Sequence, residues 1–163
     1  MRSIARSQKG ATFIEILLVA AIGAVLFGFV VVNLFKVQHT TAVGSIVNTL
    51  LADIKNQQIK AMAGATEGRV SSDSYGIYFQ ATKYILFHGT VFNPNDSANL
   101  TINLDPNLSV ATTFSNNTLI FLQKSGEVSG FASGQNTVSI QNTAGNEQKT
   151  MIVNRYGVII SIN

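Results

Sequence analysis

A single carboxylate, Glu15, lies inside a long apolar stretch near the N-terminus and constrains what this chain can form. The stretch covers 11–32, and Glu15 is the only charged residue among its 22 residues. As a helix with about 1.5 Å of rise per residue it is roughly 33 Å long, enough to cross the hydrocarbon core of a bilayer. A carboxylate inside such a helix costs about 2–3 kcal/mol unless it is paired, so its presence indicates that the charge is used.

The residues before this stretch form a short basic leader, 1–10, with three cations (Arg2, Arg6 and Lys9) and no acid. Such a flank holds the N-terminus in the cytoplasm and directs the C-terminus outward, so 11–32 is predicted to span the membrane. The sequence pI of about 9.3 reflects this leader. Of 11 Lys and Arg, 3 are in the leader, and the remaining 8 balance the 8 Asp and Glu. Overall basicity therefore does not indicate a nucleic-acid partner.

The segment 33–64 is predicted to continue the same helix in amphipathic form. Apolar residues recur there at alternating spacings of four and three, the period of one helix face. This stripe consists of Val43, Val47, Leu50, Ile54, Gln57 and Ala61. We expect the helix to end at Gly64 and its stripe to pack on a globular domain.

The remaining segment, 65–163, is predicted to be a β-rich head. Short runs rich in β-branched and aromatic residues alternate there with Asn, Ser, Asp and Gly, a pattern typical of strands. Strands are expected at 75–79, 84–88, 100–104, 119–123, 137–141, 150–154 and 158–162, with a short edge piece at 128–131. A turn at 154–157 would join the last two strands. The whole chain is thus predicted to be α+β, with the second half of one long helix packed on an antiparallel sheet.

Type IV pilins and type II secretion pseudopilins carry a processing site that resembles one stretch here, Lys9-Gly10-Ala11-Thr12-Phe13-Ile14-Glu15, followed by Ile16-Leu17-Leu18-Val19. The resemblance implies a pilin-like fold, cleavage by a prepilin peptidase between Gly10 and Ala11, and methylation of the new amine on Ala11. It also implies that Glu15, fifth in the mature chain, pairs with the amine of a neighbouring subunit. The order of strands and the closing hairpin resemble the head of H-class minor pseudopilins and related fimbrial minor pilins.

On this resemblance the chain is expected to be a structural subunit of a pilus-like or secretion filament, and not an enzyme. Its expected partners are the prepilin peptidase, other subunits of a helical filament and, before assembly, the lipid of the bacterial inner membrane. The membrane would be crossed once, with the head in the periplasm. Two features depart from the family pattern: Ala11 stands where phenylalanine is usual, and no cysteine is present to close the C-terminal region.

Little in the sequence indicates catalysis, a cofactor or a metal, and none is expected. The two histidines, His39 and His88, are far apart and have no cluster of ligand-type residues around them. Two alternatives to a filament subunit remain. One is an uncleaved, signal-anchored binding or adhesion module, which explains the apolar length but not Gly10 or Glu15. The other is a competence minor pilin that contributes to DNA uptake. Its C-terminal segment offers only Lys149 and Arg155, enough for about two phosphates, so nucleic acid is not the expected partner.

Overall fold

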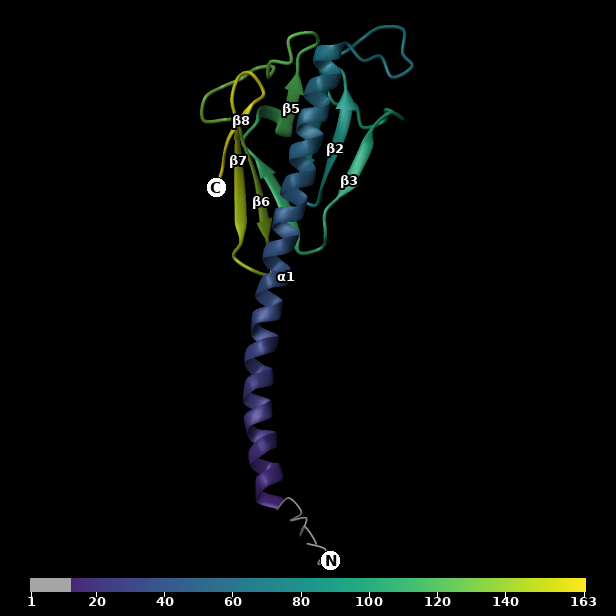
Figure 1. Ribbon diagram of the computed structural model, residues 1–163. Helices are drawn as coiled ribbons and strands as arrows, with labels where there is room; N and C mark the ends of the chain where they lie inside the picture. The colour runs from purple at the N-terminus through teal and green to yellow at the C-terminus, as the bar shows by residue number, and fades with distance from the viewer. Residues whose placement is uncertain (1–12) are drawn as a thin grey trace, which may run out of the picture. The chain divides into compact units, whose positions relative to one another are not determined.

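The computed structural model describes the backbone from residue 13 to the C-terminus, and the side chains at 13–28 and 42–163. The chain divides after Gln38, so that the second half of the long helix and all the strands belong to one compact unit, His39–Asn163. Figure 1 shows the order of elements in the described part of the chain, with one long helix followed by strands and a short 3-10 turn. The fold class is α+β, as predicted.

Helix α1 covers Phe13–Ala63 and ends where the sequence predicts. Gly64 adopts a left-handed conformation with φ of +64°, and the next N–H, of Ala65, donates to the carbonyl of Lys60 at 2.9 Å. This geometry satisfies a free carbonyl of the last turn and reverses the chain, and glycine adopts it without steric cost. The predicted apolar stripe is buried, with exposed fractions of 0–5 % for Val43, Val47, Leu50, Ile54, Gln57 and Ala61.

Over the residues that the structure describes, eight strands form two antiparallel sheets of four strands each. The first sheet has the order β3-β2-β1-β5 and consists of β1 (Tyr75–Gln80), β2 (Lys83–His88), β3 (Leu100–Asn103) and β5 (Thr118–Phe121). The second has the order β4-β6-β7-β8 and consists of β4 (Leu108–Thr112), β6 (Thr137–Asn142), β7 (Gln148–Val153) and β8 (Ile159–Ile162). A short 3-10 turn, η1 (Ser115–Asn117), precedes β5. All seven predicted strands are present, with ends shifted by at most two residues.

Three expectations about the head were wrong in detail. One sheet was expected, and two are present, because β4 pairs with β6 instead of with its neighbour in sequence, β3. Strand β4 was not predicted, since only Leu108 and Val110 are strongly apolar in it, yet both are buried at alternate positions. The edge piece expected at 128–131 is reduced to one bridge between Val128 and Phe121.

The core of this unit is shared by α1 and both sheets. Strand residues at alternate positions point into it, as the two-residue period of a half-buried strand requires. The first sheet contributes Tyr75, Ile77, Phe79, Tyr84, Leu86, Leu119 and Phe121, and the second contributes Leu108, Val110, Val138, Ile140, Met151 and Val153. These side chains meet the buried stripe of α1. The second half of the helix is therefore an integral part of the head.

Two polar side chains fix α1 against the first sheet. Gln57, only 2 % exposed, donates through Nε2 to the carbonyls of Gly76 and Phe87 at 2.8 and 3.2 Å. One turn earlier, Asp53 accepts a hydrogen bond of 2.7 Å from the hydroxyl of the fully buried Tyr84. Because buried polar groups are costly unless they are paired, these bonds select one register of the helix on the sheet.

Tyr84 is expected to make the head sensitive to alkaline pH. Burial, reinforced by the Asp53 carboxylate, raises the pKa of Tyr84 well above its usual value. The folded state therefore holds the hydroxyl proton more tightly than the unfolded chain. The resulting stabilisation is complete below about pH 10 and is lost as the pH rises above it, by up to about 1.4 kcal/mol per pH unit. Thermal unfolding followed by circular dichroism from about pH 8 to 11 measures this loss.

A substitution separates this effect from general alkaline damage. Tyr84→Phe removes the titrating group and should flatten the decline of the melting temperature above about pH 10. Tyr156→Phe alters a tyrosine that is 63 % exposed and should keep the parent slope. If Tyr84→Phe and the parent lose stability in parallel, the proton on Tyr84 is not responsible.

Candidate functional site

The first half of α1 carries many exposed apolar side chains. Ten large apolar side chains between Phe13 and Phe27 are 53–82 % exposed: Phe13, Ile14, Ile16, Leu17, Leu18, Val19, Ile22, Val25, Leu26 and Phe27. On the second half of the same helix the equivalent stripe is buried. Apolar surface of this extent needs lipid or another protein to cover it.

Glu15 is the only charge in this exposed stretch, and it lies in the first turn of α1. Free N–H groups and the helix dipole favour a negative charge at that position. Its side chain is exposed, and no cation in the described part of the chain forms an ion pair with it. The carboxylate is therefore available to a cation on another molecule.

The other residues of the predicted processing site, Arg2, Arg6, Lys9, Gly10 and Ala11, lie outside the described residues. The predicted membrane-spanning stretch, 11–32, is described with its side chains only at 13–28. Within the residues that the structure describes, no helix is both long and apolar enough to cross a membrane.

His88 makes contacts that the sequence did not indicate. Its Nε2 lies 2.9 Å from an oxygen of Asp96, and its Nδ1 lies 3.4 Å from an oxygen of Asp73. These contacts join the end of β2 to two loops that are distant in sequence from one another. Among the described side chains, no group of three His, Cys, Asp or Glu residues is arranged to hold a metal ion. The side chain of His39 lies outside the described residues.

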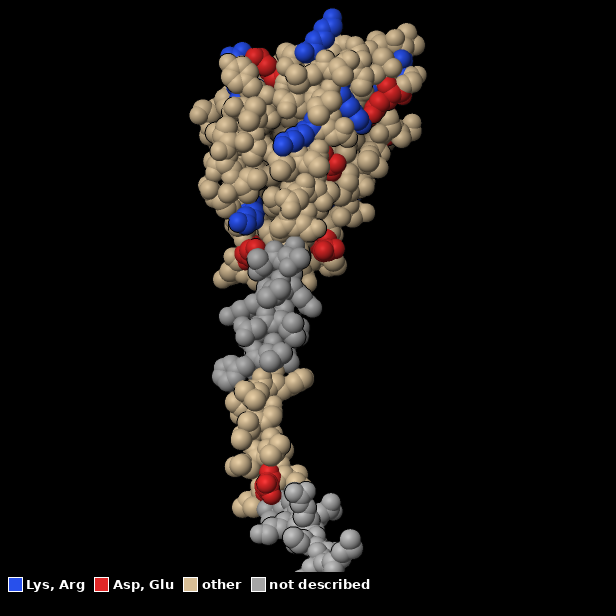
Figure 2. Space-filling view, in the orientation of Figure 1, with Lys and Arg blue, Asp and Glu red and all other residues tan. Residues whose placement is uncertain are grey.

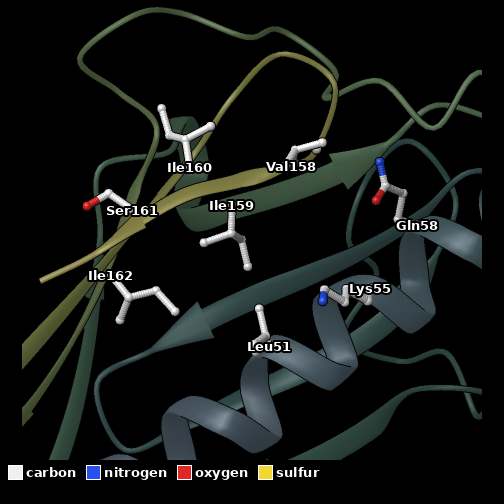
Figure 3. Close-up of a pocket in the computed structure, with 9 residues that line it drawn as sticks. Leu51, Lys55, Gln58, Val158, Ile159, Ile160, Ser161 and Ile162 are labelled. Carbon is white, nitrogen blue, oxygen red and sulfur yellow. The ribbon is translucent and has the colours of Figure 1, made fainter.

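A groove with a volume of about 440 Å³ lies between α1 and β8. Figure 3 shows Leu51 and Lys55 on the helix side, and Ile159 and Ile162 pointing from β8 toward the helix. Val158 and Ile160 point away from it. The sequence predicted the strand at 158–162 but not the groove, since its two walls are about a hundred residues apart.

A β-bulge explains why two isoleucines of β8 face the same side. Residues three apart on a regular strand point to opposite faces. Here the register shifts between Ile152 and Val153, so that Ile162 lies opposite Met151 and Ile159 lies opposite Val153. Met151 and Val153 are both fully buried, which places both isoleucines on the inner face of the sheet. The extra residue of the bulge therefore creates the apolar wall of the groove.

Among the residues that the structure describes, Lys55 is the only charged one that lines the groove. Its side chain is exposed, and it makes no ion pair with any acid in the part of the chain that the structure describes. The amide of Gln58, by contrast, is already used, because its Nε2 donates to the carbonyls of Gly126 and Tyr156 at 3.0 and 2.6 Å. The groove thus combines apolar walls with one free cation.

Comparison of the chain with protein-family models, with curated proteins and with solved structures gives no match.

Proposed function

We propose that this chain is a structural subunit, a minor pilin or pseudopilin, of a type IV pilus-like or type II secretion filament. The observation that carries the proposal is the division of α1 into two halves. The first half exposes an apolar surface with one carboxylate, Glu15, and the second half is built into the core of the β-rich head. A long helix used in this way, followed by antiparallel strands, supports the proposal of a pilin-like fold.

The chemistry of this arrangement suits transfer from lipid to a filament core. Before assembly, 11–32 would lie in the inner membrane. In the filament, apolar helices of neighbouring subunits would cover the same surface. The buried apolar area would therefore change little when the subunit moves from lipid into the filament. Glu15 would supply the selectivity, because cleavage after Gly10 creates an amine on Ala11 that can neutralise it. A subunit in the wrong register would leave both charges unpaired in a medium of low polarity.

Two observations argue against DNA as the partner. Basic and acidic side chains are interspersed over the visible face of the strand-rich unit in Figure 2, so this face presents no continuous basic surface. Arg155, one of the two C-terminal cations, lies 3.4 Å from the carboxylate of Glu127. DNA binding that depends on phosphate contacts requires several free cations gathered on one surface.

The test is the N-terminus of the protein after coexpression with a matched prepilin peptidase. The proposal predicts a chain that begins at Ala11 and is heavier by one methylene group than its bare sequence. Gly10→Val should block the cut, whereas Gly10→Ala should be tolerated better, because the peptidase must accommodate the backbone at a small residue. An intact leader, with a peptidase that cuts a control substrate, would instead support the signal-anchored binding module.

A further inference from the structure

We propose that the groove between α1 and β8 binds a small amphiphile with one carboxylate and one alkyl chain, the chemical class of the fatty acids. This activity goes beyond assembly of a filament, which the proposal above assigns to the first half of α1. It rests on the groove's shape, its apolar walls and its single unpaired cation.

The walls suit an alkyl chain. Leu51 faces Ile159 and Ile162 across the groove, and all three keep part of their surface open to it. The volume of about 440 Å³ is within the range of small-molecule sites. Each methylene that leaves water for such a surface contributes favourably to binding, so a flexible chain of several methylenes has a clear driving force.

Lys55 suits the carboxylate. A lysine can lay its aliphatic stem along an apolar wall and keep its ammonium group at the edge, where an anion can reach it. No acid of the described part of the chain lines the groove, so the charge of Lys55 has no counterpart there. An anionic head group with an apolar tail would match both parts of the site at once.

An added peptide strand matches the groove less well. Strand addition requires a regular free edge, with backbone N–H and C=O groups in ladder geometry. Strand β8 has only four residues, and the bulge opposite Ile152 and Val153 disturbs its ladder. Bulges at sheet edges are a common means of preventing strand pairing. A ligand with a single anionic group needs only one cation at the groove, and Lys55 provides it.

The experiment uses the full chain in phosphatidylcholine nanodiscs and two photoactivatable probes, a diazirine-bearing dodecanoic acid and the corresponding dodecanol. After irradiation and digestion, mass spectrometry locates the labelled residues. The acid should label the two walls of the groove, at 51–58 and 157–162, and the alcohol should label them weakly. Both probes should label the apolar stretch 13–28, which serves as an internal reference in every sample.

Matched variants test the cation. Lys55→Met keeps the aliphatic stem and should reduce labelling of the groove by the acid about tenfold, the loss expected for one charge-assisted hydrogen bond. Lys83→Met removes a lysine of β2 that is outside the groove and should have no effect. Lys55→Gln, with its melting temperature measured alongside, provides a second neutral variant.

Two results would overturn the proposal: equal labelling of the groove by acid and alcohol, or unchanged labelling in both folded Lys55 variants. Labelling of the groove does not depend on cleavage after Gly10. A chain that keeps its leader but binds the acid would contradict the filament proposal alone, and a cleaved chain with an unlabelled groove would contradict this one alone.

Discussion

Glu15→Ala is expected to reduce incorporation of this chain into filaments about a hundredfold, while membrane insertion and cleavage after Gly10 continue. An amine and a carboxylate that meet in a medium of low polarity stabilise each other. Removing one partner of such a buried pair costs about 3–5 kcal/mol, because the other charge is left uncompensated. Since each 1.4 kcal/mol corresponds to a factor of ten in an equilibrium constant, about a hundredfold is the lower end of the expected loss. Glu15→Gln removes the charge without changing the size and should behave like Glu15→Ala.

The measurement is the ratio of tagged variant in sheared filaments to tagged variant in membranes, from cells that also supply the other subunits. Asp105→Ala is the matched control, because Asp105 is an exposed acid that makes no ion pair among the described residues. It should enter filaments as the parent does. A Glu15→Ala chain that is cleaved and enters filaments in the parent proportion would show that Glu15 has no part in pairing.

Gly157→Ala should destabilise the head by about 2–5 kcal/mol, the second large effect that we expect. Gly157 lies in the turn between β7 and β8 with φ of +74°, where any side chain costs about 1–2 kcal/mol. A Cβ at this position would also lie 2.7 Å from the ring of Phe121 and would clash with the side chain of Gln58. Overpacking of this kind costs about 1–3 kcal/mol more. Gln58 would have to move, and its hydrogen bonds to Gly126 and Tyr156 would weaken.

Gly130→Ala separates the two causes. Gly130 has a similar φ of +61°, but a Cβ there would meet no atom within 4 Å. Gly130→Ala should therefore lower the free energy of unfolding only by the conformational cost, about 1–2 kcal/mol. Thermal unfolding of the full chain in detergent, followed by the circular dichroism of its strands, compares the two variants. Equal losses for Gly157→Ala and Gly130→Ala would show that the contacts with Gln58 and Phe121 are unimportant.

The periodic features of the sequence were sufficient to predict most of the secondary structure. The stripe from Val43 to Ala61 is visible because residues three and four apart share a helix face, and these residues are buried as expected. The stop at Gly64 and seven strands were predicted from neighbouring residues alone. Strand β4 was not, because it has only two strongly apolar residues, with Ser between them and Ala and Thr after them, and its place is decided by pairing with β6.

The candidate sites show the same difference: some were predictable from neighbouring residues, and others depend on the tertiary structure. Glu15 was predicted as a functional residue from local sequence, because an isolated charge within an apolar stretch stands out without any knowledge of the fold. Cleavage between Gly10 and Ala11 was predicted from the resemblance of the surrounding residues to a family processing site, and it stays a prediction. The contacts of Gln57 with two strands, the approach of Asp73 and Asp96 to His88, and the groove beside Lys55 were not identifiable. Each depends on segments that are distant in sequence or on pairing between elements.

The sequence by itself therefore determined where the helix and most strands lie, and which charge stands alone in the apolar stretch. Only the tertiary structure decided that the strands form two sheets, and that a bulge in the pairing of β7 and β8 turns Ile159 and Ile162 to one side. The physical reason is the separation in sequence of the residues that decide each feature. Helix and strand periods arise from neighbouring residues, whereas strand pairing and its register are decided by how all the apolar faces can be buried together.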